Sequence, residues 1–325
     1  MKNLHGKSPC CREKIYQHGD KRRKCSGCGR TWRVHKKKQG RRCYHPDKKL
    51  LKKIFIEGQR LRYYGKKKHF SSSGTLSIRF HKTLKQFLAE PRKEKFRCRE
   101  YILLLDALWF KFKDARWTLY MISARSVRSD TAIFLDPVLL QGKESAKHWE
   151  QVISQIPPPL KNRIKACVSD GFRGSGRLAE ENKWILQRCH FHLIAQLQIR
   201  RGQRKKLKDK YIREEIYQTA RKLLAAKRTK ILKEQLQKLI SHDDCPRKLQ
   251  SIIHEFLKDL DDFQAYLKYP QLNLPTTNNT VESMNKLIRK QCAYLRTSES
   301  LKLWATAFIR MRPKIKCNGN NFPPN

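Results

Sequence analysis

The chain has 325 residues, which is enough for two or three domains. Its 74 Lys and Arg against 28 Asp and Glu give a formal net charge of +46, which calls for a polyanionic partner, and nucleic-acid phosphates fit that requirement. An anionic membrane surface is the rival partner, but the sequence contains no strongly amphipathic basic helix, no lipidation signal and no apolar run near the roughly 18 residues of a spanning helix. Because MKNLHGKSPCC at the start contains no apolar signal core, we expect a cytoplasmic, nucleoid-associated protein with no membrane part.

Residues 1–45 are rich in Cys, Gly and basic residues and poor in aliphatic ones. Such a segment cannot fold by apolar burial alone, so we expect it to depend on a metal ion. Eleven cysteines in an intracellular chain of this length favour metal ligands and free thiols over disulfides.

The cysteine spacing in this segment predicts a zinc-ribbon-like fold. CSGC at 25–28 is typical of the second knuckle of a ribbon, whereas SPCC at 8–11 places Ser8 where the first cysteine of a Cys-Pro-x-Cys knuckle belongs. The predicted zinc ligands are Cys11, Cys25 and Cys28, with Cys10, His5 or His35 as the fourth. The alternatives are a degenerate ribbon held by packing, or free thiols.

Residues 46–97 predict helices. Pro46-Asp47 is a helix start, and SSSGT at 71–75 offers a second cap before a run of apolar residues at helical spacing. Short helices with a basic outer face predict a helix-turn-helix that binds DNA. Its predicted DNA-binding residues are Arg79, Lys82 and Lys85. An ordinary helical linker with a solvated basic face is the alternative.

From residue 98 the pattern changes to strands. YILLLDALWF, WTLYMISA and TAIFLDPVLL are three successive strand-like runs, and SAKHWEQVISQI is a helix that ends before three prolines. IKACVSD and WILQRCHF add two strands, with a short helix at RLAEEN between them. Residues 98–192 therefore predict the first part of a mixed α/β domain. Residues 193–270 predict a helical insertion, 271–312 the second part of the domain, and 313–325 a flexible tail.

Three acidic residues have the settings of a catalytic site. Asp106 and Asp170 each end a buried strand-like run, and Glu282 lies just inside a predicted helix. A buried carboxylate is costly unless it is paired or binds a metal. In a chain this basic, the three acids predict a site in which two divalent ions roughly 4 Å apart act on phosphodiesters. Oxygen ligands suit a hard cation, so we expect Mg²⁺ or Mn²⁺.

Each of these residues also has a structural alternative. Asp106 can cap a turn, the Asp170-Gly pair can be a plain turn, and Glu282 can be an exposed helix charge. Asp136 lies in an Asp-Pro turn, and we expect it to be structural. The aromatic residues after Asp106 are expected mostly to pack in the core, with stacking on a DNA base as the alternative.

The helix of Glu282 predicts two supporting residues. Asn285 and Arg289 lie three and seven positions after Glu282 and therefore on the same helical face. We expect both to lie beside the site and to contact DNA phosphates, although Arg289 can equally belong to a solvated basic face.

Several of these motifs together resemble the prokaryotic insertion-sequence transposases related to Mutator. The resemblance covers roughly residues 98–312 and rests on the strand-end Asp-Gly, a Cys-x-x-His pair soon after it, and TTN-x-x-x-Glu-x-x-Asn. It implies an RNase H-like catalytic core with an all-α insertion, in which Asp106, Asp170 and Glu282 are the DDE triad. It also implies that Cys189 and His192 order the core or contact DNA.

The resemblance further implies the reaction and the partners. Such a protein binds the double-stranded ends of an insertion sequence, hydrolyses a phosphodiester to free a 3′-OH, and joins that 3′-OH to target DNA. It acts as a homodimer or a larger assembly on DNA. The alternatives are a domesticated, non-catalytic DNA-binding protein and another RNase H-like nuclease.

Overall fold

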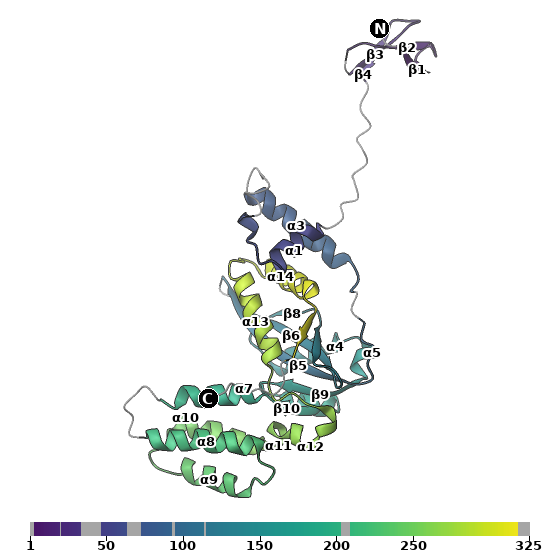
Figure 1. Cartoon of the computed structure of the whole chain (residues 1–325). Helices are drawn as coiled ribbons and strands as arrows, with labels where there is room; N and C mark the ends of the chain where they lie inside the picture. Colours follow the sequence, from purple (N-terminus) through teal and green to yellow (C-terminus); the bar gives the residue numbers. More distant parts are fainter. Residues whose placement is uncertain are drawn as a thin grey trace. The chain divides into compact units, whose positions relative to one another are not determined.

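The computed structural model describes residues 3–19, 21–33, 47–63, 73–92, 95–113, 115–202 and 209–317. The chain divides into two compact units, Met1–Pro46 and Asp47–Asn325 (Figure 1). Within the described residues, no helix is both long and apolar enough to cross a membrane. His35, one of the alternative zinc ligands, lies outside the described residues.

The small unit is a four-stranded antiparallel sheet in the order β1-β2-β3-β4. Its strands are β1 Asn3–Lys7, β2 Lys14–Gln17, β3 Arg22–Cys25 and β4 Thr31–Arg33. Among the side chains described in this unit, Ser8 and Cys25 are the buried ones. Among these described side chains the sheet therefore has almost no apolar core of its own.

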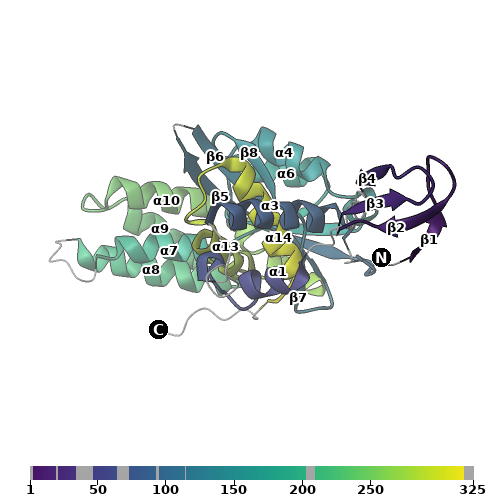
Figure 2. The ribbon, with the colours of Figure 1, turned by 90° about the horizontal axis from the view of Figure 1, so that it is seen from above.

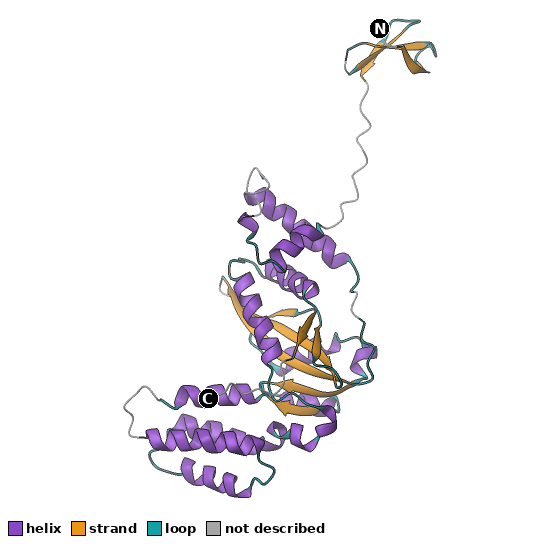
Figure 3. Cartoon of the chain, in the orientation of Figure 1, coloured by secondary structure: helices purple, strands orange, loops and turns teal. Residues whose placement is uncertain are grey.

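The large unit is built on a seven-stranded sheet in the order β10-β9-β5-β6-β7-β11, with β8 paired to β6. Its strands are β5 Tyr101–Phe112, β6 Ala115–Ser126, β7 Thr131–Phe134, β8 Val138–Gln141, β9 Ile164–Ser169, β10 Ile185–Arg188 and β11 Lys314–Lys316. Strands β5, β6 and β7 are antiparallel, whereas β9 and β10 run parallel to β5. Figure 3 shows these strands among the helices, and the mixed α/β prediction is confirmed.

Helices cover both faces of this sheet, as Figure 2 shows from above. Leu103 and Leu105 of β5 pack with helices α4 to α6, while Ile102 and Leu104 pack into the opposite cluster. The helices are α4 Ala146–Ser154, α5 Pro158–Lys161 and α6 Ser175–Glu181 on the first face, and α1 Lys48–Phe55, α3 Ser73–Ala89, α13 Asn279–Cys292 and α14 Ser298–Met311 on the second. Burial on both faces explains the unbroken apolar run at the start of β5.

The helical segment between β10 and α13 has a hydrophobic cluster of its own, from Leu193 to Phe263. It contains α7 His190–Arg200, α8 Lys210–Ala225, α9 Lys230–Ile240, α10 Arg247–Lys258, α11 Leu260–Phe263, α12 Ala265–Lys268 and the 3-10 helix η1 Pro270–Leu272. Helices α8, α9 and α10 lie where the apolar spacing predicted helices. The strand predicted over WILQRCHF is shorter than expected, because β10 ends at Arg188 and α7 already begins at His190.

The helices α1 and α3, expected in a helix-turn-helix, pack on α14. The Asp47 side chain accepts the Leu50 N–H at 3.0 Å and so caps α1, as expected. The Trp304 ring of α14 lies 5.4 Å from the Phe55 ring and 5.0 Å from the Phe80 ring, measured between centroids. Residues 64–72, between these helices, lie outside the described residues, so the helix-turn-helix itself stays a prediction.

Two predictions about strands are wrong. Asp106 lies in the middle of β5 and not at its end, because β6 pairs with β5 as far as Phe112. The segment expected to be a flexible tail includes β11, which pairs with β7 and places Ile315 against the main core cluster. β11 thus covers the edge of the sheet at β7 and adds Ile315 to the core.

Candidate functional site

Asp106 lies on β5 at the point where the pairing with β9 stops. The last β9 partner is Val168, opposite Leu104, so Asp106 lies two residues beyond the last pair. Its Oδ1 accepts a hydrogen bond from the backbone N–H of Ala107 at 2.8 Å, and its Oδ2 accepts a hydrogen bond from Nδ2 of Asn285 at 2.6 Å. Asp106 is 9% exposed, and the bond from Asn285 fixes its carboxylate toward α13.

Asp170 follows the last residue of β9, and the turn after it requires glycine. Gly171 has φ +86°, and a Cβ at this position would lie 1.9 Å from Cζ of Arg188. Arg188 is itself held by Asp259 at 2.6 Å and by Glu255 at 3.3 Å. The turn is therefore fixed both by its left-handed backbone and by a guanidinium packed against it.

Glu282 lies in the first turn of α13. Its side chain is 24% exposed, and its Oε1 lies 3.5 Å from Nδ1 of His192. Within the described part of the chain, this buried Oε1 has no hydrogen-bond partner. An unsatisfied buried carboxylate oxygen is costly and marks a place where a cation can bind.

The three acids act on one another electrostatically. Burial, with a further contribution from the Asp170 carboxylate, raises the pKa of Asp106 to about 7. Burial also raises the pKa of Glu282 to about 7, again with a contribution from Asp170. The structure thus brings together three carboxyl groups that lie far apart in the sequence.

A fourth acid in this neighbourhood was missed by the sequence reasoning. Glu144 precedes α4, and its carboxylate contributes to the raised pKa of Asp106. Its Oε1 accepts Nε1–H of Trp149 at 2.8 Å, and the Trp149 ring stacks on Phe172, two residues after Asp170, at 5.0 Å. The sequence offers no local signal for Glu144, because an acid just before a helix is common.

Cys189 and His192 lie close to Glu282, and their role stays a prediction. Burial raises the pKa of Cys189 to about 12 and lowers the pKa of His192, so both side chains are neutral near pH 7. Cys189, His192 and Glu282 offer ligand atoms that all lie within 4.8 Å of one another. Arg289, in the last turn of α13, is exposed, and its role stays a prediction.

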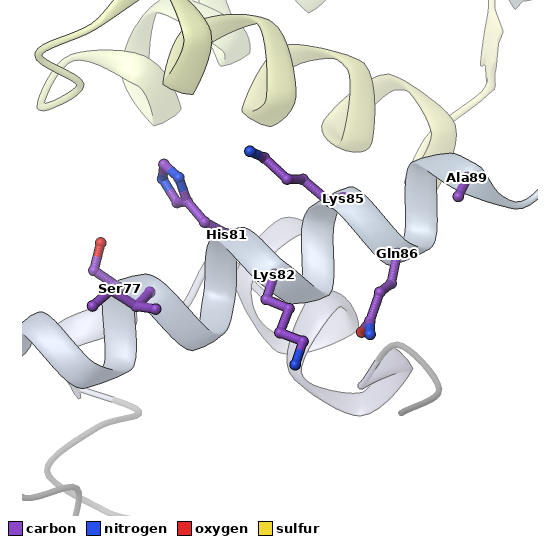
Figure 4. A pocket seen from close by; sticks show the side chains of 7 residues that line it. Ser77, His81, Lys82, Lys85, Gln86 and Ala89 are labelled. Atoms are coloured by element: carbon purple, nitrogen blue, oxygen red, sulfur yellow. The ribbon is translucent and has the colours of Figure 1, made fainter. Parts of the chain in front are cut away.

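The predicted DNA-binding cations Arg79, Lys82 and Lys85 are exposed on α3. Lys82 and Lys85 line an open hollow along this helix together with His81 (Figure 4). Lys85 Nζ also lies 2.9 Å from Glu299 of α14. This ion pair is exposed and contributes little to stability, so it does not prevent Lys85 from binding a phosphate.

Two sequence expectations about neighbouring residues hold. Asp136 binds Arg310 at 2.6 Å and Arg92 at 3.2 Å, so its carboxylate is part of a structural ion-pair network. Among the aromatic residues after Asp106, Tyr120 is fully buried, and Phe110 and Phe112 pack partly buried against the main core cluster. Trp109 remains 57% exposed, with Arg116 over its ring.

The small unit contains a separate cluster of thiols. The Sγ atoms of Cys10, Cys11, Cys25 and Cys28 all lie within 4.8 Å of one another, and those of Cys10 and Cys28 are 3.5 Å apart. Zinc–sulfur bonds of about 2.3 Å put tetrahedral sulfur ligands roughly 3.8 Å apart. The donor set therefore fits one zinc ion, with Cys10 in place as the fourth ligand.

Ser8 supports this cluster although it is not a thiol. Its Oγ accepts the N–H of Cys11 at 3.3 Å and of Glu13 at 3.1 Å, and it lies 3.1 Å from Sγ of Cys25. The hydrogen bond from Ser8 is the largest cause that lowers the pKa of Cys25 to about 6. Ser8 thus holds the first knuckle and favours the thiolate form of a neighbouring cysteine.

Comparison with known families gives one match. The sequence profile described as Transposase, Mutator family matches residues 64–297, which include Asp106, Asp170 and Glu282 but not the thiol cluster. A search of curated proteins gave no match. The profile covers well over half of the chain, so this protein belongs to the Mutator family of transposases, enzymes that cut and join DNA.

Proposed function

We propose that this transposase cuts and joins DNA through a DDE triad of Asp106, Asp170 and Glu282 on an RNase H-like core. The family supports DNA binding and the use of divalent metal ions. The mixed sheet supports the RNase H-like assignment, since three antiparallel strands are extended on one side by two strands parallel to the first.

One observation carries the proposal: the Asp170 carboxylate raises the pKa of both Asp106 and Glu282. Three acids from a strand, a turn and a helix therefore converge, although their mutual repulsion and their burial oppose this arrangement. A protein tolerates such a cluster where cations or a reaction require it.

The residues present fit a hard divalent cation. Carboxylate oxygens are the ligands that Mg²⁺ and Mn²⁺ prefer, and the buried Oε1 of Glu282 has no hydrogen-bond partner among the described residues. Asp106, Asp170 and Glu282 would hold the ions. Bound there, two such ions supply activation of the attacking oxygen and charge neutralisation at the leaving oxygen.

The surrounding residues orient these groups. Asn285 holds one oxygen of Asp106, Gly171 and Arg188 fix the turn that carries Asp170, and His192 lies beside Glu282. In the proposed reaction water cleaves a phosphodiester at the element end and leaves a 3′-OH. That 3′-OH then attacks a target phosphodiester, so that one phosphorus–oxygen bond breaks for each one formed.

The rest of the chain supplies DNA binding in this proposal. Arg79, Lys82 and Lys85 on α3 neutralise phosphates of the element end, and Arg289 contacts the flanking DNA. Zn²⁺ on the cysteine cluster orders the small basic unit. The protein works as a homodimer or larger assembly on double-stranded DNA, associated with the nucleoid.

A strand-cleavage and strand-joining assay tests the proposal. Purified protein is incubated with labelled duplexes that carry the DNA flanking its own gene, with Mg²⁺ or Mn²⁺, beside the variant Asp106→Asn. We expect metal-dependent nicking at a terminal repeat and joined products, both lost in the variant. Cutting without joining would indicate another RNase H-like nuclease, and tight binding without cutting would indicate a domesticated DNA-binding protein.

A further inference from the structure

A fully buried asparagine bonds the helix of the third acid to the strand of the first. Asn278 is 0% exposed and immediately precedes α13. Its Nδ2 donates to the carbonyl oxygen of Leu105 at 2.6 Å, and its backbone N–H donates to Sγ of Cys189 at 3.2 Å. Since Leu105 directly precedes Asp106, this side chain ties the start of the Glu282 helix to the position of Asp106.

Cys189 continues this network to the second acid. Its backbone N–H donates to the carbonyl oxygen of Ser169 at 2.8 Å, and Ser169 directly precedes Asp170. The next residue, His190, donates its backbone N–H to the carbonyl oxygen of Thr276 at 2.8 Å. The start of α7 is thus bonded on one side to the end of β9 and on the other to the segment that enters α13.

We propose that Asn278 and Cys189 are positioning residues that hold the Glu282 helix in register with Asp106 and Asp170, and that Cys189 acts as a hydrogen-bond acceptor and not as a metal ligand. This inference rests on the proposed function, because register matters only if the three acids work together. A displacement of about 1 Å at a reacting centre can cost roughly a hundredfold in rate.

The competing assignment for Cys189 is a metal site shared with His192 and Glu282. Among the described residues this group offers three ligands, one short of a closed zinc site. The sulfur of Cys189 already accepts the Asn278 N–H. A metal there would also take Glu282 away from Asp106 and Asp170, which the proposed reaction needs together.

Four variants separate the two assignments. Cys189→Ser keeps a hydrogen-bond acceptor, whereas Cys189→Ala removes it. Asn278→Asp keeps the shape of the side chain but turns an oxygen toward the Leu105 carbonyl. Asn279→Ala, at the next position, is the matched control.

Amide hydrogen exchange of the full-length protein is the first readout, because it needs neither added metal nor DNA. We expect exchange in residues 278–285 to speed up by at least about tenfold in Cys189→Ala and Asn278→Asp, and to stay within about threefold of wild type in Cys189→Ser and Asn279→Ala. Unchanged exchange in Cys189→Ala would refute the positioning role.

Mn²⁺ titration and zinc content are the second readout. We expect Mn²⁺ affinity to fall about tenfold in Cys189→Ala but not in Cys189→Ser, with the zinc content per chain unchanged in both. If Mn²⁺ affinity fell equally in the two variants, and each variant also lost one zinc ion per chain, Cys189 would instead be a metal ligand. If the exchange results are as expected but Asp106→Asn leaves Mn²⁺ affinity unchanged, the positioning network stands and the two-metal function fails.

Discussion

The two candidate metal centres of this chain lie in units of very different construction. The thiol cluster belongs to a four-stranded sheet whose buried described side chains are Ser8 and Cys25. The acid cluster belongs to a unit in which α/β packing buries large apolar clusters on both faces of a sheet. The ligand chemistry differs as well, since thiolates suit zinc and carboxylates suit magnesium or manganese.

The difference shows two ways in which metal binding can depend on the stability of a fold. The described side chains of the small unit bury almost no apolar area, so the free energy of the proposed zinc binding would have to stabilise the fold itself. In the large unit the apolar core holds the acids together against their repulsion, and a cation bound there would reduce an electrostatic cost that the fold already bears. Removal of metal should therefore unfold the first unit and should leave the second folded but inactive.

The largest expected effect is the loss of strand cleavage in Asp170→Asn, with the same substitution at Asp136 as the control. Asp170→Asn should lower strand cleavage by at least about a thousandfold, which is about 4 kcal/mol of transition-state stabilisation, with thermal stability unchanged or raised. Asp136→Asn, which loses the bonds from Arg310 and Arg92, should keep cleavage and lose about 2 kcal/mol of unfolding free energy. Cleavage assays and denaturant titration measure both quantities, and a reversal of the two results would remove Asp170 from the site.

The next effect is the loss of structure in the small unit. Replacing Cys25 and Cys28 together by Ser should abolish zinc binding and unfold residues 3–33, while the core of residues 101–316 keeps its protection from hydrogen exchange. Metal analysis and exchange by mass spectrometry test this. Full zinc occupancy in the double variant would contradict the thiol site.

The pH dependence of metal binding is a smaller effect. In the folded protein the pKa values of Asp106 and Glu282 are raised to about 7, whereas in the unfolded chain they lie near 4. The free energy of unfolding of the metal-free protein is therefore highest below about pH 4 and falls as the pH rises to about 7. Each group is about one-tenth ionised at pH 6 and about nine-tenths ionised at pH 8, so Mn²⁺ should bind up to roughly a hundredfold more tightly at pH 8. Calorimetric titration at the two pH values tests this, and equal affinities would show that these carboxyls do not bind the ion.

The smallest effect concerns the hydroxyl beside the thiol cluster. Ser8→Ala removes the acceptor of two backbone N–H groups and the hydrogen bond to Cys25, so zinc affinity should fall about tenfold and the pKa of Cys25 should rise. Competition with a chromogenic chelator measures the affinity. The exposed Ser26→Ala is the control, and the same loss in both would argue against a specific role for Ser8.

The sequence predicted the elements of the large unit better than their ends. Apolar runs and helical spacing identified β5, β9 and the helices of residues 193–268, because burial on both faces or on one stripe leaves a clear pattern. The position of Asp106 inside β5 was not predictable, since it depends on how far β6 continues the pairing. β11 was missed because three residues carry too little pattern to signal a strand.

The site was partly readable for a similar reason. Asp106, Asp170 and Glu282 stand in recognisable local settings, so their convergence could be expected from the motifs. Glu144 was not found, because its place beside the site depends on contacts such as its bond from Trp149, whose ring packs on Phe172. Long-range packing of this kind leaves no trace in the residues beside it.

The packing of α1 and α3 on α14 has a consequence for synthesis of the chain. Phe55 and Phe80 complete their core only when Trp304 is present, and Glu282 follows Asp170 by a whole helical segment. Contacts of such long sequence separation form late in folding. During translation, a chain that has not yet reached α14 thus cannot complete the core around Phe55 and Phe80, so we expect α1 and α3 to pack in place only when the last helix has been made.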